Sequence, residues 1–165
     1  ELPQGYQPVC ATGTEKGIPA KNLTKDWADY FAFAKETFSE KQIAESGMCT
    51  AGEGFLAFGD NLYRMPERMP GVKGLKVMRP GLHLGTLKKN RFEPAHALAL
   101  ALRPEDVKHV WNLSVEEAAA YLKGQTFSAE GEKGWYLICV DGVSLGWGKL
   151  AGGIMKNHYP KGLRK

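Results

Sequence analysis

Cysteine is scarce in this sequence of 165 residues, which has only three, at positions 10, 49 and 139. The number is odd, the spacing is wide, and no C-x-x-C pair occurs. This usage argues against a disulfide framework and favours the reducing cytoplasm as the location of the protein.

Long hydrophobic runs are also missing, because no stretch of 18 apolar residues occurs. A membrane span is therefore not predicted, and no membrane is expected among the partners. The sequence begins with Glu1 and continues without an apolar signal region, so we expect a fragment excised or processed from a longer chain. With 43% hydrophobic and 24% charged residues, the composition is that of one globular domain or two small ones.

The motifs of common enzyme classes are absent. The sequence has no G-x-G-x-x-G, no G-x-x-x-x-G-K-[ST] and no G-x-S-x-G, which argues against dinucleotide, P-loop and nucleophile-elbow sites. The four histidines lack metal-ligand spacing with one another or with cysteine, so no metal site is predicted. Cys10 and Cys49 are flanked by loop residues and could be reactive if the pKa of either thiol were lowered; the alternative is an ordinary loop or packed thiol.

Acidic residues are missing from two segments. Residues 72–91 carry six basic residues and residues 142–165 carry five, in a chain whose net charge is only +4. If folding brings the two segments together, they form one face that attracts polyanions. The alternative is two solvated basic loops, which charge runs usually are.

The N-terminal half is predicted to contain a linker, a helix and short strands. Residues 1–23 contain six glycine or proline residues, which is typical of an extended segment. A helix capped by Thr24 follows, and its aromatic stripe is interpreted as core. Strands are predicted at 55–58, 61–63 and 75–78, joined by turns at 59–60 and 70–71.

The C-terminal half is predicted to contain two helices and a hairpin. Pro94 suits the first position of a largely buried helix that ends before Pro104. Ser114 and Glu117 form a capping box for the second helix, and Gly124 ends it. Trp135–Val140 is the strongest strand, and Asp141-Gly142 predicts a hairpin with 143–147. The predicted fold class is α+β, with a small β-rich unit followed by a compact unit that has two helices and a C-terminal hairpin.

Candidate RNA-binding residues lie in and beside the two basic segments. Lysine and arginine can hold phosphates, and an aromatic ring can stack on a splayed base. Trp147 could stack on a base or pack in the core, and Asn157 could read a base edge or only shape the turn before Pro160. The glycines on either side of Trp147 could mark a β-bulge or a close approach of RNA. The full set is Lys88, Lys89, Arg91, Trp147, Lys149, Lys156, Asn157, His158, Tyr159, Lys161 and Arg164.

Three of these stretches also resemble a known family. Residues 88–102, 145–149 and 156–164 resemble a C-terminal signature of bacterial RNA cytosine-5 methyltransferases of the Nol/Nop/Sun family, and in order and spacing the RsmF-type subgroup that acts on small-subunit ribosomal RNA. Residues 59–63 and 75–85 look like the intermediate domain that precedes it. The resemblance covers residues 27–164.

The resemblance implies an accessory region without its catalytic domain. Residues 1–23 would be the linker from that missing domain, 24–87 a small mixed intermediate domain, and 88–165 a PUA-like RNA-binding domain of the β-barrel type. The family's catalytic domain binds S-adenosylmethionine and has two cysteines in Pro-Cys and Thr-Cys contexts. Here Cys10 follows Val9 and Cys49 follows Met48, so no catalytic residue is carried over and no cofactor is expected in this fragment.

Three functions follow as hypotheses. The leading one is a non-catalytic region that positions a methyltransferase on structured RNA, expected to be small-subunit ribosomal RNA. Its partners would be that RNA and the covalently linked methyltransferase domain. The second is a structural module that packs against the catalytic domain without touching RNA. The third is a small enzyme with Cys49 as its nucleophile.

Overall fold

The computed structural model describes residues 27–48, 54–66, 78–89 and 91–164. Two helices come first, α1 (Ala28–Thr37) and α2 (Glu40–Glu45). The predicted aromatic stripe is confirmed as core, since Tyr30 of α1 and the cap residues Trp27 and Phe38 are almost fully buried. Ser39 caps α2 by accepting a hydrogen bond from the backbone N–H of Gln42. Thr24, the predicted cap of α1, lies outside the described residues.

The first sheet is antiparallel and has the order β1-β2-β3-β4. Its strands are β1 (Phe55–Phe58), β2 (Asn61–Arg64), β3 (Leu82–Lys88) and β4 (Arg91–Pro94). The first two confirm the predicted strands and the turn at 59–60. Residues 75–77 of the third predicted strand and the turn at 70–71 lie outside the described residues. Strands β3 and β4 pair across the predicted domain boundary at 87/88, and that boundary stays a prediction.

The second sheet has the order β5-β7-β8-β9-β6. It consists of β5 (Val110–Asn112), β6 (Phe127–Ser128), β7 (Gly134–Val140), β8 (Val143–Ala151) and β9 (Ile154–Asn157). The Asp141-Gly142 hairpin is confirmed, and both residues have the positive φ of a tight hairpin turn, 48° and 76°. Trp111 and Phe127 come from the two edge strands, yet their ring centroids are 5.8 Å apart. The sheet is therefore curled toward a barrel.

Two further helices belong to the second half of the chain, α3 (His96–Ala101) and α4 (Val115–Leu122). The capping box of Ser114 and Glu117 is confirmed by both of its hydrogen bonds. The prediction for α3 was partly wrong, because Pro94 ends β4 instead of opening the helix and Leu100 is 57% exposed. The backbone N–H of Ala95 donates to Leu84 O, which keeps the chain extended up to the helix.

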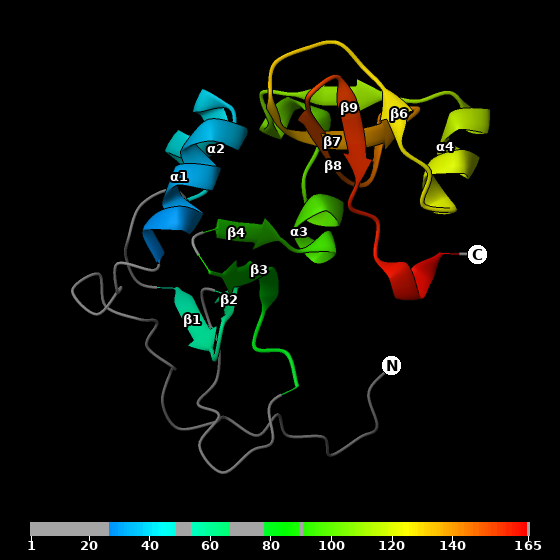
Figure 1. The fold of residues 1–165 in the computed structure, drawn as a ribbon. Helices are drawn as coiled ribbons and strands as arrows, with labels where there is room; N and C mark the ends of the chain where they lie inside the picture. Colours follow the sequence, from blue (N-terminus) through cyan, green and yellow to red (C-terminus); the bar gives the residue numbers. More distant parts are fainter. Residues whose placement is uncertain (1–26, 49–53, 67–77, 90, 165) are drawn as a thin grey trace, which may run out of the picture.

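The larger hydrophobic core is shared by both sheets. It joins Tyr30 and Phe33 of α1, Phe92 of β4, Leu98 of α3 and Trp147 of β8. Helix α3 contacts both β3 and β8 and lies between the two sheets (Figure 1). A smaller cluster lies on the other side of the second sheet and contains Tyr121 of α4. Strand β7 serves both clusters, because its alternate residues point to opposite faces.

Two 3₁₀ turns lie in the second half of the chain. The 3₁₀ turn η3 (Pro104–Asp106) leads from α3 toward β5, and η4 (Lys161–Leu163) follows β9 near the end of the chain. None of the helices in the described ranges has the length and apolar character needed to cross a membrane.

Candidate nucleic-acid interface

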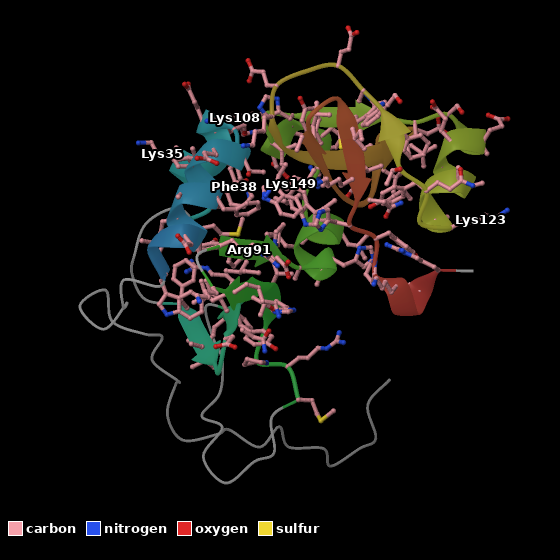
Figure 2. All side chains as sticks on the ribbon, viewed as in Figure 1. Lys35, Phe38, Arg91, Lys108, Lys123 and Lys149 are labelled. Atoms are coloured by element: carbon pink, nitrogen blue, oxygen red, sulfur yellow. The ribbon has the colours of Figure 1, made fainter. Side chains whose placement is uncertain are left out.

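The two basic segments of the sequence meet at one groove. Arg91 of the first segment and Lys149, Lys156 and His158 of the second line a surface hollow of about 410 Å³. We name it the cationic groove; its lining residues are Arg91, Phe92, Glu93, Lys133, Trp135, Lys149, Ala151, Lys156 and His158. In Figure 2, Arg91 and Lys149 lie near each other at the centre, whereas Lys123 lies apart at the end of α4.

A cross-strand row forms one wall of this groove. Trp135 of β7 is directly opposite Lys149 of β8, and Lys149 is directly opposite Lys156 of β9. Directly opposite residues in antiparallel strands share one face of the sheet. The Lys149 Nζ atom lies 4.9 Å from the centroid of the Trp135 ring, within the range of a cation–π contact. Like charges directly opposite each other destabilise a sheet. A bound anion would relieve the repulsion between these two lysines.

The opposite wall comes from β4 of the first sheet. Arg91 donates to the Glu93 carboxylate at 3.0 Å, and the two side chains are 63% and 36% exposed. Such an exposed pair contributes little to stability, about 0–1 kcal/mol. Four cationic side chains thus surround a single carboxylate, and the groove carries an excess of positive charge.

Trp135 and His158 form an aromatic surface inside the groove. Their ring centroids are 4.6 Å apart at 66°, and Trp135 also contacts Phe33 and Trp147 in the core. Burial lowers the pKa of His158, Glu93 opposes that shift, and Lys149, Lys156 and Arg164 add to it. A neutral imidazole offers both a donor and an acceptor.

Three of the predicted residues are exposed and are not among the residues that line this groove, although Lys88 is directly opposite Arg91 in the β3–β4 pair. Lys88 and Lys89 are exposed where β3 leads into β4, and Lys161 is exposed in η4. Their role in RNA binding stays a prediction.

The structure corrects the stacking alternative for Trp147. Its side chain is only 1% exposed, and its indole N–H donates to Ala95 O at 3.0 Å. Trp147 is therefore a core residue. The flanking glycines make room for packing, since a Cβ at Gly146 would lie 2.6 Å from the Tyr121 hydroxyl and one at Gly148 would lie 2.6 Å from Met155 Sδ. A register shift at Ile138/Cys139 gives the hairpin the bulge that was the other alternative.

Asn157 has the turn-shaping role that was the alternative to reading a base edge. Its Nδ2 donates to Tyr121 O and Gln125 O, and its Oδ1 accepts from the backbone N–H of Tyr159. These three hydrogen bonds already use both ends of the amide.

Tyr159 and Arg164 are also held by the fold. The Tyr159 ring packs edge-on against Tyr121 and His96. Arg164 donates from two nitrogens to Tyr159 O. Both are half-buried, and neither lines the cationic groove.

Sequence reasoning missed Lys133, Trp135 and Glu93. Lys133 lies in a stretch that is acidic overall, so a count of charge by segment hides it. Trp135 was predicted only as the first residue of the strand 135–140. A regular register counted from the turn would place it opposite Gly148, and the register shift at Ile138/Cys139 is what places it opposite Lys149. Glu93 gives no local signal, because its place beside the lysines depends on how the two sheets pack.

The described residues bear on the metal and nucleophile hypotheses. No three of their histidine, cysteine, aspartate and glutamate side chains gather closely enough to hold a metal. Cys139 is buried in β7, and burial raises the pKa of its thiol to about 11. Cys10 and Cys49 lie outside the described residues.

Comparison with known proteins identifies relatives for both halves. A family described as the RsmF rRNA methyltransferase first C-terminal domain matches residues 32–102, and one described as the methyltransferase RsmF PUA domain matches residues 108–165. The chain is 26% identical over 106 residues to "Ribosomal RNA small subunit methyltransferase F" of Vibrio atlanticus (strain LGP32). That match covers 62% of this chain and 22% of the relative, so the chain spans only about a fifth of the relative's length.

Proposed function

Because the chain belongs to the RsmF rRNA methyltransferase family and comprises its first C-terminal domain and its PUA domain, we propose that it is an RNA-binding accessory region. It binds structured RNA through the cationic groove and adds affinity and orientation to a methyltransferase domain in the same longer protein. Tethering of this kind raises the effective concentration of the catalytic domain at its target.

The observation that carries the proposal is the convergence of the two acid-free segments. Arg91 and Lys149 are 58 positions apart in the sequence, yet they line one groove together with Lys133 and Lys156. Cations in that number match a run of phosphates, and the half-buried Trp135 provides a flat ring beside them.

The substrate is proposed to be small-subunit ribosomal RNA, as the name of the relative states for that protein. The chemistry belongs to the methyltransferase domain with its S-adenosylmethionine, and this chain contributes no catalytic group and no cofactor site. The cytoplasm is the compartment in which such an RNA would be met.

The test is fluorescence anisotropy of the chain with a labelled small-subunit ribosomal RNA hairpin at several salt concentrations. Lys156→Glu is the informative variant, because it reverses a charge in the groove and also turns the Lys149–Lys156 repulsion into an attraction. We expect its RNA affinity to fall about tenfold or more, with a shallower salt dependence, while its stability does not decrease.

Lys123→Glu is the matched control, since it makes the same change of charge at an exposed residue on α4 outside the cationic groove. If the two variants lose the same amount of RNA affinity, the effect comes from the overall charge of the chain, and the proposal is contradicted. Failure of the folded chain to bind RNA at low salt would favour the structural-module hypothesis instead.

A further inference from the structure

A second and larger groove adjoins the first. It measures about 510 Å³ and lies where β2, β3, α3 and η4 approach one another. We name it the junction groove; the argument uses Tyr63, Arg79, His83, His96, Leu100 and Leu163 from its lining. Its lining residues come from the first sheet, from α3 and from η4 near the end of the chain. The groove therefore forms only when these elements have packed together.

Exposed apolar side chains are concentrated here. Six large hydrophobic residues are well exposed among the described residues, and three of them line this groove: Met78 at 81%, Leu100 at 57% and Leu163 at 52%. Scattered exposed apolar residues need no explanation, but convergence on one concavity indicates a surface that a ligand covers.

The polar side chains of the groove suit a ligand that has a neutral, hydrogen-bonding group and an anionic group next to it. Tyr63 and His83 are stacked, with centroids 4.9 Å apart at 27°. Burial lowers the pKa of both His83 and His96, so these rings are neutral at neutral pH. The Nε2 atom of His83 donates to Gly85 O at 3.1 Å, which leaves Nδ1 of that ring as an acceptor. The Nδ1 atom of His96 is buried, which leaves Nε2 of that ring for a ligand. Arg79 is exposed, and no acidic side chain is among the described residues that line the groove.

The two grooves lie on either side of one short stretch of chain. Residues 91–93 line the cationic groove, and residues 95–97 line the junction groove. At the other end, His158 lines the first groove, while the next residue, Tyr159, packs on His96 of the second. A nucleic-acid strand held by its phosphates in the cationic groove therefore needs to pass over only this stretch to reach the junction groove.

We propose that the junction groove accepts an unpaired base of the same RNA. The apolar side chains of Met78, Leu100 and Leu163 contact the faces of the base, His83 and His96 meet its polar edge, and Arg79 contacts an adjoining phosphate. This inference rests on the proposed RNA binding and adds a ligand class, a single-stranded nucleotide next to a paired stem.

Charge favours a nucleotide over a protein segment as the occupant. The junction groove has one cation and no carboxylate among its lining residues, and the cationic groove beyond residues 91–97 has four cations, so the two together attract a polyanion. Bases present an apolar face with a polar edge, which matches the mixture of leucine, methionine and imidazole.

The experiment compares three RNAs by fluorescence anisotropy with the full 165-residue chain. One is a blunt hairpin, the second carries a short unpaired extension, and the third carries the same extension without bases. We expect the extension to raise affinity about tenfold and the abasic extension to give little of that gain.

The matched variants are Leu100→Ala/Leu163→Ala and, as a control, Val115→Ala/Val143→Ala. All four residues are 52–66% exposed, and neither valine lines the junction groove or the cationic groove. The leucine variant is expected to lose most of the gain from the extension and to bind the blunt hairpin as before. Photo-crosslinking from a 4-thiouridine in the extension should label residues 78–100.

The outcomes separate this inference from the proposed function. If the blunt hairpin binds but the extension adds nothing, or if the leucine variant keeps the full gain, the base site is wrong and RNA binding stands. An equal gain from the abasic extension would assign the groove to phosphate. If none of the three RNAs binds, both proposals fail.

Discussion

Two tryptophans on neighbouring strands show how position decides the role of a residue. Trp147 is opposite Leu137 in the middle of the β7–β8 pair and is buried, whereas Trp135 is opposite Lys149 nearer the end and lines the cationic groove. Both are aromatic residues in a strand, so residue type could not distinguish them. Trp135 rests on the core and leaves part of its surface to a ligand, as amphipathic rings at binding surfaces do.

Three histidines predict how stability depends on pH. Burial lowers the pKa of His83, His96 and His158 from an ordinary value of 6.5. The unfolded chain therefore takes up these protons at higher pH than the folded chain. Their contribution to stability is complete above the ordinary value and is lost as the pH falls through it toward the lowered values.

The measurement is the urea midpoint across that pH range for the chain and for His83→Gln/His96→Gln/His158→Gln. We expect the midpoint of the unchanged chain to fall with acidification and that of the triple variant to fall less. Above pH 7, the difference between the two urea midpoints reports the packing that the substitutions remove. The test is therefore the difference in how steeply the two midpoints fall with pH. A triple variant with the original slope would contradict the assignment.

At the scale of elements, the β7–β8 hairpin depends on its turn. Gly142 has φ +76°, and a Cβ built on it would meet nothing within 4 Å. Gly142→Ala therefore tests backbone strain alone, and we expect it to destabilise the chain by about 1–2 kcal/mol. Urea unfolding measures the difference.

Gly162→Ala is the control for this prediction. A Cβ at Gly162 also has open space, and its φ lies outside the left-handed region. An equal loss of stability in both variants would show that the turn is not the cause. A larger loss at Gly142 is expected because β7 and β8 form the centre of the second sheet. Their pairing also holds the cross-strand row of Trp135, Lys149 and Lys156 in register.

At the scale of the whole molecule, one core serves both family regions. Phe92 of β4 contacts Tyr30 and Phe33 of α1, each at 5.1 Å between centroids, and Phe33 contacts Trp147 of the second sheet at 5.8 Å. Separate domains joined by a linker would not share such contacts. We therefore expect the two sheets to unfold in one cooperative transition.

The test follows urea unfolding by tryptophan fluorescence and by far-ultraviolet circular dichroism. The two curves should coincide, and Phe92→Ala should shift both to lower urea together, with a loss of about 3–5 kcal/mol. Leu100→Ala is the control, because that side chain is largely exposed and should shift neither curve by much. Two separated transitions would show that the halves fold independently.

Prediction from sequence was best where the causes are local. The capping box of α4 and the turn at 141–142 each involve a few consecutive residues, and both were confirmed. The beginning of α3 was wrong because a tertiary hydrogen bond, from Ala95 N–H to Leu84 O, holds Pro94 in a strand. In the candidate site, Arg91, Lys149, Lys156 and His158 were predicted from the basic segments and the resemblance. The structure places all four in the lining of one groove, and their contact with RNA stays a prediction.

The sequence by itself determined the α+β class, the helices and strands that follow from periodicity and turn residues, and the two segments that attract anions. These properties depend on neighbours along the chain. Only the tertiary structure decided that Lys133 and Glu93 join the groove, that Trp147 does not, and that a junction groove exists. The physical reason is that these contacts link residues from different sheets, whose packing depends on the shared core rather than on any local pattern.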